Sequence, residues 1–263
     1  MSFFKPGRLT PHDIALIAGD SEMAQQALRE LRRTMPDVSP EDAKIIVVLG
    51  GDGTMLEVMH ATMHLNKPLY GMNCGSIGFL LNQYSPDYLI ERIEKARLVT
   101  LAPLVMQAYQ RDGQVTVARA INEISLWRAS RQAAKIRIDI DGVNRLAELI
   151  CDGIMAATPA GSTAYNLSAH GPILPLKSQA LALTPICAFR PRRWRGAILH
   201  HDAKITLQVL EADKRPVHAA ADSLEVGNID RIEITTDNER LICLLFDEDY
   251  SLEERMIAEQ FIA

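Results

Sequence analysis

One short segment combines glycines with a carboxylate in an arrangement that could do chemistry. Residues 50–54 read Gly-Gly-Asp-Gly-Thr and follow an apolar, β-branched run at 45–49. Glycines let the main chain approach phosphate oxygens, and the amides at the start of a following helix point towards an anion. Asp52 adds a negative charge, which opposes phosphate binding unless it takes a proton or holds a metal. The predicted phosphate loop consists of Gly50, Gly51, Gly53 and Thr54.

The same segment has a plain structural interpretation. Clusters of glycine and aspartate are ordinary turn signals, and an aspartate at this place can cap a helix. The segment contains neither the GxxxxGK[ST] pattern of a Walker A loop nor the GxGxxG pattern of a dinucleotide fold. Residue types alone therefore favour a turn and a phosphate site about equally.

A second group of polar residues lies later in the chain. Asn122 and Glu123 interrupt a strand-like run, and residues 152–169 read Asp-Gly-Ile-Met-Ala-Ala-Thr-Pro-Ala-Gly-Ser-Thr-Ala-Tyr-Asn-Leu-Ser-Ala. An amide beside a carboxylate offers hydrogen-bond donors and acceptors, and the Asp152 carboxylate offers a further acceptor. The residues from Thr163 on combine hydroxyls, an aromatic face and a helix start. Alone, these residues also fit a β-bulge and a capped helix.

The patterns around the first segment predict an open, mostly parallel α/β sheet. Short apolar runs at 14–18, 45–49 and 68–72 predict strands, and the run at 45–49 is typical of a strand covered on both faces. Helical spacing follows each run, first over 23–31, then from about Thr54 to His64, and then from Ser85 to about Arg97. Repeated strand–helix units place the Gly-Gly-Asp-Gly-Thr turn at the carboxyl edge of the sheet, where such folds bind ligands.

From about Val99 the pattern changes to strands joined by tight turns. Arg-Asp-Gly at 111–113 and Asp-Gly at 141–142 are hairpin signals, and apolar residues alternate between them and beyond. The segment 162–169 is predicted to be one helix start inside this β region. Ser251 opens a capping box for a final helix. We expect an α/β lobe at 1–98, completed by the helix at about 247–263, and a β-rich lobe at 99–246.

Composition limits the possible partners. The 263 residues carry 28 Lys and Arg against 33 Asp and Glu, a formal net charge of −5. A mildly acidic chain lacks the cationic surface that nucleic acids require. No run approaches the length of a membrane span, and the N-terminal residues lack the apolar stretch of a signal peptide. Four dispersed cysteines predict free thiols in a cytoplasmic protein.

Taken together, the motifs resemble one protein family. Gly-Gly-Asp-Gly-Thr after an apolar strand resembles a superfamily that contains NAD kinases, diacylglycerol- and sphingosine-type lipid kinases and 6-phosphofructokinases. The block at 152–169 resembles the NAD kinase signature, Asn122-Glu123 matches that family's Asn-Glu motif, and residues 71–79 resemble its glycine loop after the third strand. The correspondence runs in order over nearly the whole chain. It implies a bacterial-type NAD kinase with a Rossmann-like α/β lobe and a β-sandwich-like lobe.

The resemblance also implies a reaction and its residues. An NAD kinase transfers the γ-phosphoryl group of ATP to the 2′-hydroxyl of the adenosine ribose of NAD, and makes NADP. Asp52 is then the catalytic base, in a crevice between the lobes. Mg²⁺ is expected with ATP, no residue is assigned as its ligand, and a homodimer or homotetramer is expected. The residues that the resemblance assigns to NAD are Asp52, Gly53, Asn122, Glu123, Asp152, Ala160, Thr163, Ala164, Tyr165, Asn166, Leu167 and Ser168.

Two alternative functions remain open, and the chain departs from the family's sequence pattern at two places. A lipid kinase would leave the Thr-Pro-Ala-Gly-Ser-Thr-Ala-Tyr block at 158–165 unexplained, and a non-catalytic nucleotide sensor would leave Asp52 without a role. The family commonly has Gly-Gly where this chain has His170-Gly171, and Asp-Gly-Gln where it has Asp222-Ser223-Leu224. The four arginines at 190–195 could meet phosphates, another subunit or only water.

Overall fold

The chain folds into two units, each with its own core. The computed structural model describes residues 8–75, 78–248, 256 and 261. One unit is formed by the described residues up to Leu101 together with those between Arg240 and Glu259, and the second unit is formed by Ala102–Glu239 with Phe261. The two units are called the α/β unit and the β unit below.

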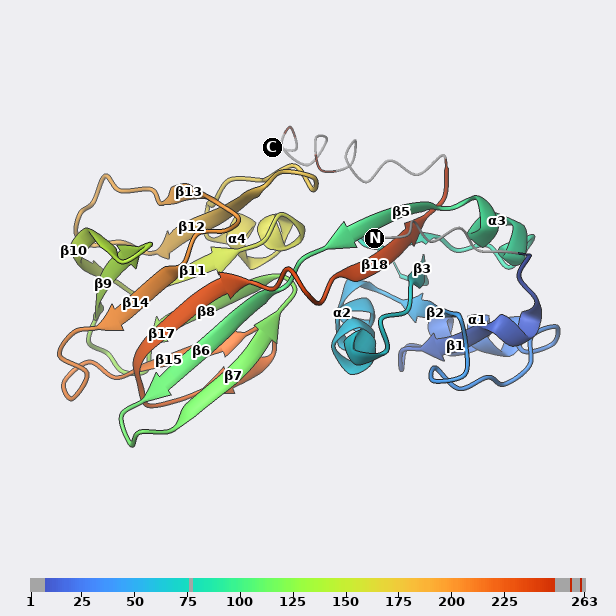
Figure 1. The fold of residues 1–263 in the computed structure, drawn as a ribbon, viewed down its shortest axis with the longest axis horizontal. Helices are drawn as coiled ribbons and strands as arrows, with labels where there is room; N and C mark the ends of the chain where they lie inside the picture. The colour runs from blue at the N-terminus through green and yellow to red at the C-terminus, as the bar shows by residue number, and fades with distance from the viewer. Residues whose placement is uncertain (1–7, 76–77, 249–255, 257–260, 262–263) are drawn as a thin grey trace. The chain divides into compact units, whose positions relative to one another are not determined.

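A six-stranded sheet forms the centre of the α/β unit (Figure 1). Its order is β1-β2-β3-β18-β5, with β4 paired to β3. All pairs are parallel except β18 with β5, so the predicted mostly parallel sheet is confirmed. The strands are β1 (Ile14–Ala18), β2 (Ile45–Gly50), β3 (Leu69–Asn73), β4 (Asn82–Gln83), β5 (Arg97–Leu101) and β18 (Ile242–Phe246).

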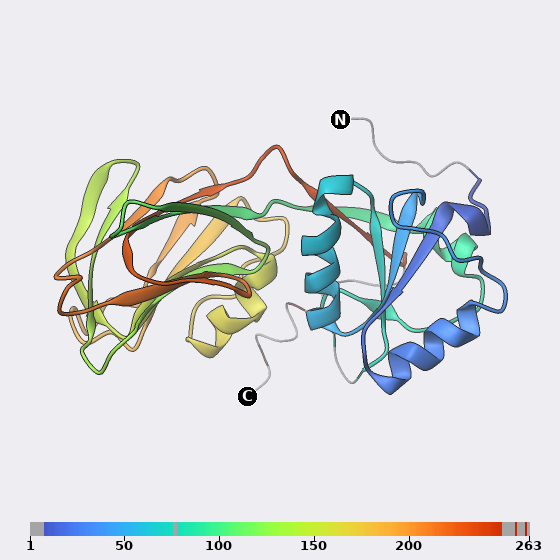
Figure 2. The ribbon, with the colours of Figure 1, turned by 90° about the horizontal axis from the view of Figure 1, so that it is seen from below.

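Helices cover both faces of this sheet (Figure 2). Apolar residues of α1 and α3 pack in one cluster with alternate residues of β2, namely Ile45, Val47 and Leu49. The residues between them are also buried and point to the other face, against which α2 packs. The helical segments are the 3₁₀ turn η1 (Pro11–Asp13), α1 (Glu22–Leu31), α2 (Asp52–Thr62), the 3₁₀ turn η2 (Met63–Leu65) and α3 (Leu89–Lys95).

Two expected boundaries differ from the structure. The sequence prediction began the third helix near Ser85, but Tyr88 adopts a left-handed φ of 53°, so α3 begins only at Leu89. The prediction also placed residues 242–246 in the β-rich lobe. They form β18, which pairs with β3 and β5 in the α/β unit. Most of the helix predicted from Ser251 lies outside the described residues.

The β unit is a sandwich of two antiparallel six-stranded sheets. One sheet has the order β10-β9-β14-β17-β6-β7 and the second has the order β13-β12-β11-β8-β15-β16. The strands of the first sheet are β6 (Leu104–Gln110), β7 (Val115–Ala120), β9 (Ala134–Ile140), β10 (Val143–Cys151), β14 (Ile205–Val209) and β17 (Ile229–Thr236). Those of the second are β8 (Glu123–Arg128), β11 (Gly153–Ala157), β12 (Ala180–Ile186), β13 (Ala197–His200), β15 (Val217–Ala221) and β16 (Leu224–Val226).

Alternating apolar residues from both sheets form the core of the sandwich. Ile136 and Ile138 of one sheet and Leu126 and Ile154 of the other belong to one buried cluster. The predicted turn at 141–142 joins β9 to β10, and both Asp141 and Gly142 have positive φ values, as a type I′ hairpin turn requires. Between β11 and β12 lie the 3₁₀ turn η3 (Ala160–Thr163) and the short helix α4 (Tyr165–Ser168). Among the described residues, no helix has the length and apolar character needed to span a membrane.

Candidate active site

Asp52 stands at the start of a helix and holds a second loop. Strand β2 ends at Gly50, and α2 begins at Asp52 with Gly51 as its N-cap. One carboxylate oxygen of Asp52 accepts the N–H of Phe79 at 2.8 Å, and the other accepts the N–H of Leu80 at 2.9 Å. The half-buried carboxylate therefore ties the Gly-Gly-Asp-Gly-Thr turn to the segment after β3. Sequence reasoning found both segments but not this contact.

The glycines of the turn have different surroundings. A Cβ on Gly50 would lie 2.6 Å from Oγ1 of Thr54, and a Cβ on Gly19 would lie 2.5 Å from the same atom. The Thr54 side chain therefore fills the space between the ends of β1 and β2, which gives it a packing role. By contrast, a Cβ on Gly51 or Gly53 would meet nothing within 4 Å. Gly51 and Gly53 thus border open space at the start of α2, where main-chain amides can reach an anion.

In the β unit, Thr158 of the Thr-Pro-Ala-Gly segment binds the main chain at the Asn-Glu pair. Thr158 donates its hydroxyl to the carbonyl oxygen of Ile121 at 2.7 Å and its N–H to that of Asn122 at 2.9 Å. A Cβ on Gly161 would lie 2.2 Å from the Asn122 carbonyl oxygen, so only glycine permits this approach. The structure therefore brings Asn122, Glu123 and the Ala160 turn together.

Asp222 supports the same pair and was not assigned a role from the sequence. Its carboxylate accepts the N–H groups of Ile121, Asn122 and Glu123 at 2.6, 3.0 and 3.2 Å. Its own N–H donates to the Glu123 carbonyl oxygen at 3.1 Å. The signal was present in the family resemblance, since Asp222 stands where the family commonly has the aspartate of Asp-Gly-Gln.

The Glu123 side chain is largely buried and unusually basic for a glutamate. Its Oε2 atom is buried and has no hydrogen-bond partner among the described residues. Burial disfavours the charged form, and the nearby charge of Asp222 adds repulsion, so the pKa of Glu123 rises to about 7. Near neutral pH this carboxyl can both hold and release a proton.

The segment around α4 divides into exposed and buried residues. Tyr165 is 46% exposed, Thr163, Ala164 and Leu167 are half-buried, and Ser168 is exposed. The side chain of Asn166 is fully buried. Its amide donates to the carbonyl oxygens of Ser162 and Pro172 at 3.2 and 2.9 Å, and its oxygen accepts from Thr184 at 2.7 Å. Asn166 therefore holds the segment together, whereas the other five predicted residues have accessible surface.

The end of α4 explains one departure from the family pattern. His170 has a φ of 62°, its N–H donates to the Leu167 carbonyl, and the next N–H, of Gly171, donates to the Asn166 carbonyl. These bonds form a Schellman motif, whose left-handed residue is usually glycine. The family glycine at this place thus corresponds to a backbone conformation that histidine adopts at a cost.

Asp152 lies apart from the residues described so far in the β unit. It precedes β11, and its carboxylate pairs with Arg128 at the end of β8, at 2.6 Å. In the pairing of these strands Gly153 is opposite Trp127, whereas Ala157 is opposite Glu123. Four residues of strand, about 13 Å, separate the two ends. The structure therefore does not bring Asp152 together with Asn122 and Glu123 of the same chain.

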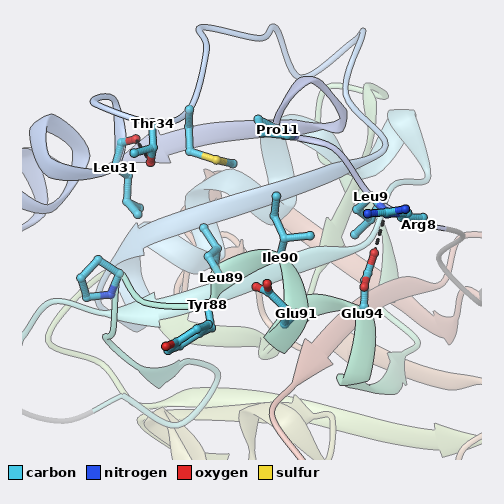
Figure 3. Close-up of a pocket in the computed structure, with 12 residues that line it drawn as sticks. Arg8, Leu9, Pro11, Leu31, Thr34, Tyr88, Leu89, Ile90, Glu91 and Glu94 are labelled. Atoms are coloured by element: carbon cyan, nitrogen blue, oxygen red, sulfur yellow. Dashed lines mark hydrogen bonds between the residues drawn. The ribbon is translucent and has the colours of Figure 1, made fainter.

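Other polar clusters lie outside this group. The guanidinium groups of the cluster Arg190, Arg192, Arg193 and Arg195 are exposed, and none forms an ion pair with a described residue. A cavity of about 610 Å³ in the α/β unit contains none of the predicted site residues (Figure 3). Glu91 and Glu94 line it, and Glu94 accepts the N–H of Leu9 at 2.7 Å.

Comparison with known proteins agrees with both units. Residues 9–96 match the family model described as the ATP-NAD kinase N-terminal domain, and residues 121–241 match that of the ATP-NAD kinase C-terminal domain. The NAD kinase of Caulobacter vibrioides is 53% identical over 250 residues, which are 95% of this chain and 96% of that protein. The NAD kinase of Hyphomonas neptunium is 52% identical over 96% of this chain and 99% of its own length.

Solved structures show the same fold at lower identity. The yeast NADH kinase complexed with NADH has a TM-score of 0.81 and 22% identity, and the match covers 94% of this chain and 86% of that one. An NAD kinase from Archaeoglobus fulgidus in complex with ATP has a TM-score of 0.75 and 23% identity, with 95% and 99% covered. Both confirm the predicted combination of an α/β and a β-rich unit.

Proposed function

The chain belongs to the NAD kinase family and phosphorylates NAD with ATP, and we propose that Asp52 is the base that accepts the proton of the ribose 2′-hydroxyl. The observation that carries this proposal is the fixed carboxylate between two open glycines. Asp52 is held by two main-chain amides, while Gly51 and Gly53 border open space. A hydroxyl is a weak nucleophile at neutral pH, so a positioned base assists the transfer.

Phosphoryl transfer otherwise depends on positioning and charge neutralisation. In the proposed arrangement the amides at the start of α2 bind phosphate oxygens. The surroundings of Asp52 fit a divalent cation that arrives with ATP, because each carboxylate oxygen accepts one main-chain N–H and retains further acceptor capacity. Bound Mg²⁺ would neutralise phosphate charge during transfer.

The β unit supplies the proposed contacts to NAD. Asn122 and Glu123 offer an amide and a carboxyl to the adenosine moiety, and the exposed ring of Tyr165 offers a stacking face. The proposed residues further include Ala160, Thr163, Ala164, Leu167 and Ser168, with Asn166 acting from below through its buried bonds. Asp152 is retained as a proposed NAD contact, although it does not share the Asn122 cluster.

The test of the base is the Asp52→Asn variant, assayed by NADP formation from NAD, ATP and Mg²⁺. We expect kcat to fall about 100-fold or more, the usual contribution of a general base. The melting temperature is measured beside it, because the NH2 group of Asn would face one of the two N–H donors that the Asp52 carboxylate accepts. Asp20→Asn is the matched control, because Asp20 is an exposed acid that follows the neighbouring strand β1. Full turnover in Asp52→Asn would refute the role.

We also propose a cytoplasmic location and a homo-oligomeric assembly for the enzyme. Free cysteines, two of them buried, fit the reducing cytoplasm. A homodimer or homotetramer is supported by exposed apolar side chains of the β unit such as Phe189 and Ile198, 53% and 62% exposed. Light scattering on the purified protein tests the assembly, and a monomer at micromolar concentration contradicts it.

A further inference from the structure

Asp222 makes more bonds to its neighbours than a turn residue needs. It lies between β15 and β16 with a left-handed φ of 49°, and its carboxylate accepts three consecutive main-chain amides, those of Ile121, Asn122 and Glu123. Three N–H donors directed at one carboxylate suit a negative charge. Asp222 also donates its own N–H to the Glu123 carbonyl oxygen, so the two residues are joined in both directions.

The described residues next to Glu123 include no positively charged side chain that would offset the negative charge of Asp222. Across β11 its neighbour is Ala157, and on β15 the neighbouring residue next to Asp222 is Ala221. The adjoining segment contributes Thr158, Ser162 and Thr163, which are not charged at neutral pH. Among the described residues, Asp222 is therefore the charged group that acts on Glu123. A buried carboxylate that lacks a donor and faces a second carboxylate is costly to ionise.

We propose that Asp222 is a positioning residue for Glu123: it fixes the main chain of Ile121–Glu123 and, by its negative charge, favours the protonated form of Glu123 in the absence of NAD. A ribose hydroxyl of NAD then donates a hydrogen bond to the Glu123 carboxylate, and the Glu123 proton leaves to solvent. NAD binding therefore releases a proton and becomes tighter as the pH rises towards neutrality. The proposal rests on the proposed assignment of Glu123 to the NAD site.

The first test uses the free protein, so it does not depend on NAD. Carboxyl ¹³C NMR follows the titration of Glu123, assigned by comparison with Glu123→Gln. We expect a midpoint near the pKa of about 7 in the wild-type chain and a lower midpoint in Asp222→Asn, which stays above the ordinary 4.5 because burial of Glu123 remains. An ordinary midpoint in the wild-type chain, or an unchanged midpoint in Asp222→Asn, overturns the proposal. If Asp222→Asn fails to fold, an ordinary midpoint in the wild-type chain still overturns the proposal.

The second test measures proton release on NAD binding. Calorimetric titration with NAD at pH 7, in two buffers of different ionisation enthalpy, reports the number of protons exchanged. With a pKa near 7, about half a proton per bound NAD is expected for the wild-type chain and none for Glu123→Gln. Glu225→Gln, an exposed glutamate on β16, is the matched control and keeps the release.

The two tests separate this proposal from the assignment of the site. Equal proton release in the wild-type chain and Glu123→Gln would overturn the linkage. An unchanged NAD affinity in Glu123→Gln, together with a wild-type midpoint near 7, would remove Glu123 from the NAD site and the linkage with it, but would leave the effect of Asp222 on Glu123 intact. A purely structural role for Asp222 would lower stability without moving the Glu123 midpoint.

Discussion

Removing the ionisable group of Glu123 is expected to change how stability depends on pH. The unfolded chain ionises this glutamate with a pKa near 4.5, whereas burial and Asp222 raise it to about 7 in the folded protein. Between these values the folded state binds more protons than the unfolded state, so the free energy of unfolding falls as the pH rises. Above pH 7 the loss is complete, and below about pH 4.5 it is absent.

The size of the effect follows from the two pKa values. Each unit of difference corresponds to about 1.4 kcal/mol, so the interval from 4.5 to about 7 corresponds to about 3.5 kcal/mol as an upper value over the whole pH range. Glu123→Gln has no proton to lose. The free energy of unfolding of the variant, minus that of the wild-type chain, should therefore grow by up to roughly 3 kcal/mol between pH 4.5 and pH 8.

Urea denaturation at several pH values measures this difference. Only its change with pH carries the argument, because an amide at this buried place adds a penalty of its own that does not depend on pH. Glu225→Gln is again the control and should follow the wild-type chain at every pH, since Glu225 is exposed. Parallel pH curves for Glu123→Gln and the wild-type chain would refute the reasoning.

Four further substitutions, of which Gly51→Ala is a control, test packing, backbone conformation and one ion pair by thermal unfolding. Gly50→Ala should lower the free energy of unfolding by about 1–3 kcal/mol, because its Cβ would lie 2.6 Å from the Thr54 side chain. Gly51→Ala should leave the free energy of unfolding unchanged, because its Cβ would meet nothing within 4 Å. Equal losses in the two variants would contradict this packing role of Thr54. His170→Gly should raise stability by about 1 kcal/mol, and a loss would contradict the left-handed cost. Arg92→Leu should cost about 2 kcal/mol because Asp247 loses its ion pair at 2.6 Å, and an unchanged melting temperature would show that the pair contributes nothing.

Local patterns predicted most elements of the fold. The unbroken apolar run of β2 and the helical spacing of α1 each depend on residues close in sequence, and both elements form where predicted. The turn at 141–142 was predictable for the same reason, because Asp-Gly suits two successive positive φ values. The place of β18 was not predictable in this way, since its partners β3 and β5 lie more than 130 residues earlier.

In the candidate site too, features that depend on neighbouring residues were predictable and contacts between distant residues were not. Residue types and family motifs identified Asp52, Asn122 and Glu123, but not the bonds that hold them. The amides that fix Asp52 belong to residues 79 and 80, and the carboxylate that fixes Glu123 is about 100 positions later, at Asp222. Asp152 is the opposite case: it is close in sequence to the Thr158–Tyr165 block, but it lies at the other end of β11 from Ala157, which pairs with Glu123. Sequence proximity is no measure of distance along a strand that crosses a sheet.

The departure at residues 170–171 shows which glycine the fold requires. Histidine can occupy the left-handed position 170, because this backbone conformation costs about 1–2 kcal/mol and the chain can bear that cost. Gly171 has no such freedom, since a Cβ there would lie 2.1 Å from Oδ1 of the buried Asn166. That oxygen accepts the Thr184 hydroxyl, and the amide of Asn166 binds the turn before α4. The chain therefore differs from the family pattern at the position where the cost is conformational, and it keeps glycine where a side chain would break the bonds that shape the Thr163–Ser168 segment.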